Sequence, residues 1–140
     1  MKPDTILILY VEDDPLTLRS VTDRLRRHGV GVLAADSGEQ ALNLVQDHPA
    51  LSAVLVDLNL PGIDGLETYA RLVISYPGLP LVVCSAHTEE GVQNRLRSMG
   101  VPEHCHLRKP CPFRSLLAAI EDAIRHSQAG KSADGDRPSQ

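Results

Sequence analysis

The stretch that decides the fold is VLVDLNLPGIDG, residues Val54–Gly65. It begins with a branched apolar run, the composition of a strand buried inside a sheet, and that run ends on Asp57. A carboxylate at the edge of a core is destabilising unless other groups compensate it. The stretch therefore predicts a buried strand that ends at a functional site, and the compensating groups must come from elsewhere in the chain.

Length and composition predict one ordinary domain. The chain has 140 residues, of which 42% are hydrophobic, enough for a single core. Its net charge of −4, with basic residues spread over several segments, argues against direct binding to nucleic acid or to an anionic membrane. The apolar run Ile6–Val11 is too short for a membrane span or a signal-peptide core, so we expect a cytoplasmic protein. The three cysteines form no CxxC pair and suggest neither a disulfide framework nor a four-cysteine zinc site.

Apolar runs and segments of helical period alternate along the chain. We expect five strands, at Ile6–Val11, Val32–Ala35, Ala53–Val56, Leu81–Cys84 and, more weakly, around His104–Leu107. Helical spacing of apolar residues lies between and after them, over Leu18–Leu25, Ala41–Val45, Leu66–Val73, Val92–Met99 and Leu116–Ile124. Strands joined by helical crossovers should be parallel. The pattern predicts an α/β fold with a doubly wound five-stranded parallel sheet and helices on both faces.

Capping signals support these boundaries. Asp14 before Pro15 is typical of a helix start, Gly29 is a candidate helix end, and Ser37-Gly38-Glu39-Gln40 fits a capping box. The small polar residues after His126 show no period. We expect a domain over residues 5–127 and a disordered tail or linker stub over residues 128–140.

The candidate chemistry collects at the expected strand ends. In an open parallel sheet the functional crevice lies outside the carboxyl ends of the strands. The residues that end or follow the first, third, fourth and fifth strands are Glu12, Asp13 and Asp14, then Asp57, Ser85 and Lys109. Crowded carboxylates repel one another unless a cation binds among them, and oxygen ligands favour Mg²⁺. A lysine and a hydroxyl group both suit a phosphoryl oxygen, so the site suits a phosphoryl group carried by a carboxylate.

Over residues 5–127 the chain resembles the receiver domain of response regulators in two-component signal transduction. The matching pieces are YVEDD, VDLNLPGIDG, VVCSAH and LRKP. The resemblance implies the flavodoxin-like strand order 2-1-3-4-5. It also implies that Asp57 accepts the phosphoryl group, that Glu12, Asp13, Asp57 and the backbone carbonyl of Asn59 hold Mg²⁺, and that Lys109 and Ser85 contact the phosphoryl group.

The same resemblance implies function and partners. The domain would be a phosphorylation-dependent switch, not a classical enzyme, although it would assist its own phosphorylation and dephosphorylation. A histidine kinase or phosphotransfer protein would donate the phosphoryl group. The surface of the expected fourth helix, fifth strand and fifth helix would then control a downstream protein or output domain, and a homodimer through this surface is compatible with the family.

One departure from the family pattern is His106, which stands where receivers usually carry a switch aromatic. It is a candidate switch residue together with Ser85, or else a half-exposed strand histidine without a signalling role. His87, two residues after Ser85, could lie near the phosphoryl group or only line the rim. The group His104, Cys105, His106 and Cys111 matches no standard zinc spacing, which argues against a zinc site.

Two other functions compete with the receiver. A flavodoxin-like carrier would need a glycine- and hydroxyl-rich phosphate loop after the first strand, where this chain has three acids. A phosphatase with an aspartyl nucleophile usually places that residue at the first strand, with a second acid two residues later. Here Asp57 lies in the middle of the chain, and Asn59 stands two residues after it.

Overall fold

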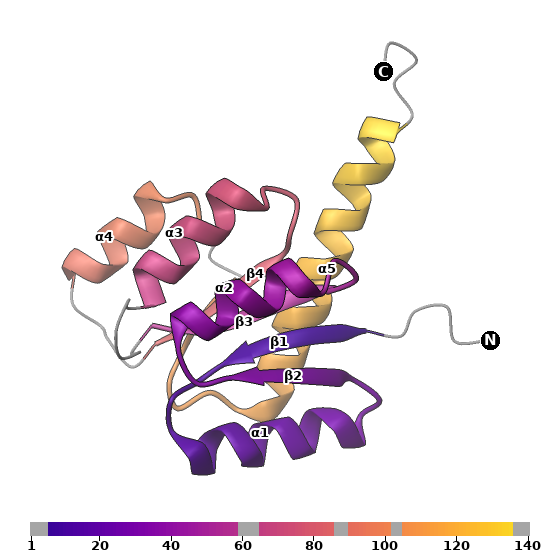
Figure 1. The fold of residues 1–140 in the computed structure, drawn as a ribbon. Helices are drawn as coiled ribbons and strands as arrows, with labels where there is room; N and C mark the ends of the chain where they lie inside the picture. The colour runs from indigo at the N-terminus through magenta and orange to yellow at the C-terminus, as the bar shows by residue number, and fades with distance from the viewer. Residues whose placement is uncertain (1–5, 59–64, 86–89, 102–104, 136–140) are drawn as a thin grey trace.

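A computed structural model describes residues 6–58, 65–85, 90–101 and 105–135 of the chain. Its elements alternate between strand and helix, as the apolar pattern predicts (Figure 1). They are β1 (Leu7–Val11), α1 (Pro15–Arg27), β2 (Gly31–Ala35), α2 (Gly38–Asp47), β3 (Ala53–Asp57), α3 (Gly65–Ser75), β4 (Leu81–Ser85), α4 (Glu90–Ser98), β5 (His106–Arg108) and α5 (Phe113–Gly135).

The strands form one parallel sheet in the order β2-β1-β3-β4-β5, which confirms the predicted fold class. In Figure 1, α2 crosses in front of the sheet, α3 lies next to α2, and α5 lies behind the sheet. Helix α1 packs on the same face as α5, since the guanidinium of Arg24 on α1 lies 4.3 Å from the centre of the Phe113 ring on α5. All five residues of β3 and of β4 are buried, as expected for central strands that are covered on both faces.

The capping signals act largely as predicted. The Asp14 side chain accepts a hydrogen bond from Thr17 N at 3.0 Å, and Pro15 opens α1. Beyond the end of α1, Gly29 has a φ of +83°, and Val30 N donates back to the carbonyl of Leu25. The Ser37 Oγ accepts from Gln40 N, but the Gln40 amide oxygen accepts from Asp36 N and not from the N-cap nitrogen itself. The capping box is therefore closed one residue earlier than the standard motif.

Helix α5 is longer than the sequence pattern suggests. It continues through residues 128–135, which we expected to belong to a tail. The stretch contains no proline before Pro138, and adding a residue to an existing helix is far easier than starting a new one. The Ser127 Oγ also donates to the carbonyl of Gly78 at 3.2 Å and holds α5 against the α3–β4 connection. The division into a domain over 5–127 and a tail over 128–140 stays a prediction.

Within the described ranges, no helix combines the length and the apolar character that a membrane crossing requires.

Candidate functional site

The parallel sheet brings the predicted site residues to one edge. Asp57 is the last residue of β3, Ser85 is the last residue of β4, and Lys109 directly follows β5. Strand β1 pairs with β3 through Val11 and Val56, so Glu12 and Asp13 emerge beside Asp57. Lys109 N donates to the carbonyl of Ser85 at 2.9 Å and thereby joins the ends of β4 and β5.

Three carboxylates meet at this edge. Glu12, Asp13 and Asp57 each offer an oxygen, and these oxygens all lie within 4.8 Å of one another. Glu12 and Asp57 are each only 2% exposed, whereas Asp13 is exposed. Among the described residues, this is the one cluster of histidine, cysteine, aspartate or glutamate side chains that could hold a metal ion. An all-oxygen donor set of this kind fits a hard divalent cation such as Mg²⁺.

Lys109 provides a positive charge inside the carboxylate cluster. Its Nζ lies 2.9 Å from Asp57 Oδ2 and 3.3 Å from Glu12 Oε1. Burial lowers the pKa of Lys109, but the hydrogen bond and charge of Asp57, followed by the charge of Glu12, raise it overall. Three carboxylates and one ammonium leave an excess of two negative charges when all four groups are ionised. That excess matches the charge of a divalent cation.

The pKa of Glu12 is raised in this crowded cluster. Burial and then hydrogen bonding to Asp57 raise its pKa to about 7, although the bond from Asp14 N and the charge of Lys109 act the other way. The carboxyl therefore holds a proton for part of the time at neutral pH unless a cation is bound. Asp14 lies next to the cluster in sequence, but its side chain caps α1, and the hydrogen bonds from Thr17 lower its pKa.

The cavity at this edge extends below the acids toward the core. Its volume is about 470 Å³, and α1 and α5 close it through Thr17, Val21 and Leu116. Cys84 and Cys111 also line it, and burial raises the pKa of both thiols. The tyrosine Tyr10 lies in the same cavity, and its hydroxyl donates to Glu12 Oε1 at 3.3 Å.

The contact between Tyr10 and Glu12 was missed by the sequence analysis. The signal was present, because residues two apart on a strand point to the same face. Burial, followed by the charge of Glu12, raises the pKa of Tyr10 well above its ordinary value.

Not every predicted residue falls within the described ranges. Asn59, His87 and His104 lie outside them, so their expected roles stay predictions. Ser85 is fully buried at the end of β4. His106, at the start of β5, is half-buried, and its Nε2 has no hydrogen-bond partner within the described part of the chain. Burial, and then the charge of Arg108, lower the pKa of His106.

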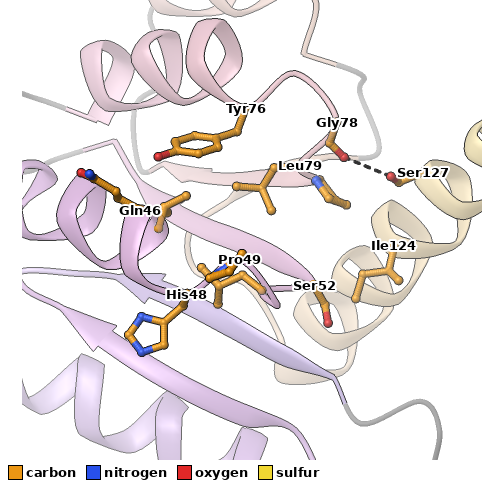
Figure 2. A pocket seen from close by; sticks show the side chains of 12 residues that line it. Gln46, His48, Pro49, Ser52, Tyr76, Gly78, Leu79, Ile124 and Ser127 are labelled. Carbon is orange, nitrogen blue, oxygen red and sulfur yellow. Dashed lines mark hydrogen bonds between the residues drawn. The ribbon is translucent and has the colours of Figure 1, made fainter.

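A second cavity of about 420 Å³ lies at the opposite end of the strands, where β3 and β4 begin (Figure 2). Ser52 and Leu79 precede β3 and β4, and Ile124 and Ser127 come from α5. This cavity contains none of the predicted site residues. The acids and Lys109 belong to the other end of the strands, as the rule for open parallel sheets predicts.

Comparison with known proteins defines the class. The family model of the response regulator receiver domain matches residues 8–121, so the chain belongs to this family. It is 36% identical to the transcriptional activator protein ExaE of Pseudomonas putida over 129 residues, which cover 88% of this chain and 55% of ExaE. It is also 36% identical to the sensor protein TorS of Escherichia coli K12 over 97 residues, 69% of this chain and 11% of TorS. The chain thus spans well under two thirds of either relative.

Solved structures agree with this assignment. The signal receiver domain of a modulated diguanylate cyclase from Desulfovibrio desulfuricans G20 is 29% identical, with a TM-score of 0.80 over 91% of this chain and 99% of that one. A CheY-like receiver domain protein from Methanospirillum hungatei JF-1 is 21% identical and shares the fold, with a TM-score of 0.83 over the same shares of the two chains. Receiver domains are signalling domains of two-component systems, so phosphorylation and signal transduction are implied for this chain.

Proposed function

We propose that this chain is a phosphorylation-dependent switch that accepts a phosphoryl group on Asp57 from a histidine kinase or a phosphotransfer protein in the cytoplasm. The observation that carries the proposal is the placement of Asp57. It is buried at the end of a central strand, within 4.8 Å of two further acids and 2.9 Å from the Lys109 ammonium. An ammonium at this distance suits the charge that develops on a transferring phosphoryl group.

In the transfer step, an oxygen of Asp57 attacks phosphorus in line with the departing imidazole. The new O–P bond forms as the N–P bond of the phosphohistidine breaks, and the imidazole takes the electron pair. Glu12, Asp13 and Asp57 would hold Mg²⁺, with the backbone carbonyl of Asn59 as a further ligand. Bound there, the ion would neutralise charge on the phosphoryl oxygens.

Lys109 changes partners when the adduct forms. Asp57 gives up its carboxylate charge as it becomes an acyl phosphate, and the ammonium then pairs with a phosphoryl oxygen. The Ser85 hydroxyl turns toward the same group. Because Lys109 N donates a hydrogen bond to the carbonyl of Ser85, movement of either residue also moves the ends of β4 and β5.

The proposed output surface consists of α4, β5 and α5. His106 begins β5, opposite Val83 of β4, and is the candidate switch residue that changes position with Ser85. A downstream protein or an output domain would bind this surface, and two copies of the chain could pair through it. The unsatisfied Nε2 of His106 supports this role, because an unpaired polar atom favours a change to a position with a partner.

Acetyl phosphate labelling in the presence of Mg²⁺ tests the proposal. We expect one lasting phosphoryl group on the parent, detected by intact mass, and none on Asp57→Asn. Asp36→Asn is the matched control, because Asp36 is exposed and follows β2 at the same edge of the sheet. Labelling of Asp57→Asn at the parent rate would refute the assignment. Steady release of phosphate without an adduct would instead favour the phosphatase.

A further inference from the structure

The side chain of Tyr10 connects the core of the sheet to the acidic cluster. Tyr10 is the last residue but one of β1, is only 5% exposed, and points to the same face as Glu12. Its hydroxyl donates to Glu12 Oε1 at 3.3 Å. Both residues line the cavity that also contains Asp57 and Lys109. Tyr10 therefore reaches a proposed ion ligand without itself being one.

Glu12 is held by three donors of different kinds. Oε1 accepts from the Tyr10 hydroxyl and from Lys109 Nζ, each at 3.3 Å, and Oε2 accepts from Asp14 N at 3.2 Å. Lys109 is shared with Asp57 and would move toward a phosphoryl oxygen. Tyr10 cannot follow it, because its ring is packed in the core. A phenol with an ordinary pKa of about 10 also keeps its proton at neutral pH and stays a donor.

We propose that Tyr10 is a positioning residue that fixes the Glu12 carboxylate for Mg²⁺ and keeps it in place when Lys109 turns to the phosphoryl group. This inference rests on the proposed function, because it presupposes an ion at the acidic cluster. A glutamate has one more rotatable bond than an aspartate, so its carboxylate needs more restraint to face an ion. The Tyr10 hydroxyl and Asp14 N restrain one oxygen each.

Groups that orient metal ligands typically change metal affinity by about 10- to 100-fold when they are removed. Glu12 keeps two donors without the hydroxyl, so we expect the lower end of that range. The Mg²⁺ dissociation constant of Tyr10→Phe should therefore rise by about 10-fold. Tyr69→Phe is the matched control, since Tyr69 is equally buried, at 5% exposed, but lies on α3. Its Mg²⁺ affinity should equal that of the parent.

Calorimetric titration with Mg²⁺ should be repeated in a Glu12→Asp background. The shorter carboxylate no longer reaches the hydroxyl, so Tyr10→Phe should there change the affinity by less than about twofold. An equal loss in both backgrounds would overturn the inference, because it would mean that the ring change disturbs packing in general. A parent that binds Mg²⁺ and a Tyr10→Phe variant that binds it equally well would overturn the inference and leave the proposed function standing. A parent that binds no Mg²⁺ would overturn both.

A readout without metal completes the test. Asp14 N donates a hydrogen bond to Oε2 of Glu12, so the amide resonance of Asp14 reports the orientation of the Glu12 carboxylate. In metal-free protein we expect this resonance to shift in Tyr10→Phe and to stay in place in Tyr69→Phe. An Asp14 amide that is unmoved in Tyr10→Phe would contradict the positioning role.

Discussion

The acidic cluster should destabilise the fold until a cation binds, and Asp13 is the residue that tests this. Its carboxylate oxygen lies within 4.8 Å of those of Glu12 and Asp57. Asp13 is exposed while the other two acids are buried, so Asp13→Asn removes a charge and disturbs little packing. The substitution therefore isolates the electrostatic contribution of the cluster.

The magnitude follows from the geometry. Two unit charges 4.8 Å apart repel by about 0.9 kcal/mol in bulk water and by about 3.5 kcal/mol at an effective dielectric constant of 20. Asp13 is exposed, so the lower figure applies to each of its two neighbours, and screening by solvent and salt reduces the sum of about 1.8 kcal/mol further. The variant should then gain about 1 kcal/mol, or about 4 °C in melting temperature for a chain of 140 residues.

Thermal melts at pH 8 provide the assay, because Glu12, with a pKa near 7, is then mostly ionised. Without metal, Asp13→Asn should melt at a higher temperature than the parent. The control Asp36→Asn, at an exposed residue, should melt at the same temperature as the parent. At ten times the dissociation constant, Mg²⁺ should stabilise the parent by about 1.4 kcal/mol and the Asp13 variant far less. A parent indifferent to Mg²⁺, or a variant that gains as much as the parent, would refute the acidic-cluster model.

Two further predictions concern the partners of Asp57. Lys109→Met leaves two buried carboxylates without the ammonium that pairs with them. The free energy of unfolding of the metal-free variant should therefore fall by about 2–3 kcal/mol, less than for a fully buried pair because Lys109 is 30% exposed. Its Mg²⁺ affinity in calorimetry should not fall, because an ammonium is no ligand, and weaker binding would contradict this reading. For Glu12, burial raises the pKa from 4.5 to about 7, so the folded state binds more protons than the unfolded one between these values, and its contribution to stability falls as pH rises. In metal-free melts the stability of Glu12→Gln relative to the parent should grow from pH 4.5 to 7 and then level off, and a constant difference would exclude the raised pKa.

Sequence alone predicted the strands and the sheet edge because both depend on local pattern. The apolar runs place β1 to β4 within one residue at each end, and the carboxyl ends of parallel strands meet at one edge. The weakest run misplaced β5, which was expected around His104–Leu107 and lies at His106–Arg108. Alternating histidine and cysteine carry little strand signal there, and the pairing of Val83 with His106 fixes the register instead.

The remaining features depend on contacts that no local pattern specifies. The length of α5 is supported by the contact of Ser127 with Gly78, which is 49 residues away in the chain. The hydrogen bond from Tyr10 to Glu12 has a sequence signal in their two-residue spacing, but the same spacing occurs along every strand. A raised pKa at Glu12 depends on its burial and on Asp57, which only the assembled sheet brings near.

Backbone contacts, as well as electrostatic ones, hold Asp57 at the edge of the core. The residue after it is held on two sides, since Leu58 N donates to the carbonyl of Cys84 at 3.0 Å and Gly65 N donates to the carbonyl of Leu58 at 3.1 Å. Gly65 approaches so closely that a Cβ there would lie 2.2 Å from Leu58 Cα and 2.4 Å from the carbonyl oxygen of Asp57. The glycine that ends the stretch Val54–Gly65 thus lets α3 begin directly against the end of β3. Because this backbone is anchored and the Asp57 side chain is buried, the carboxylate has little freedom to move away from the other acids, and its charge must be balanced in place by Lys109 or by a bound cation.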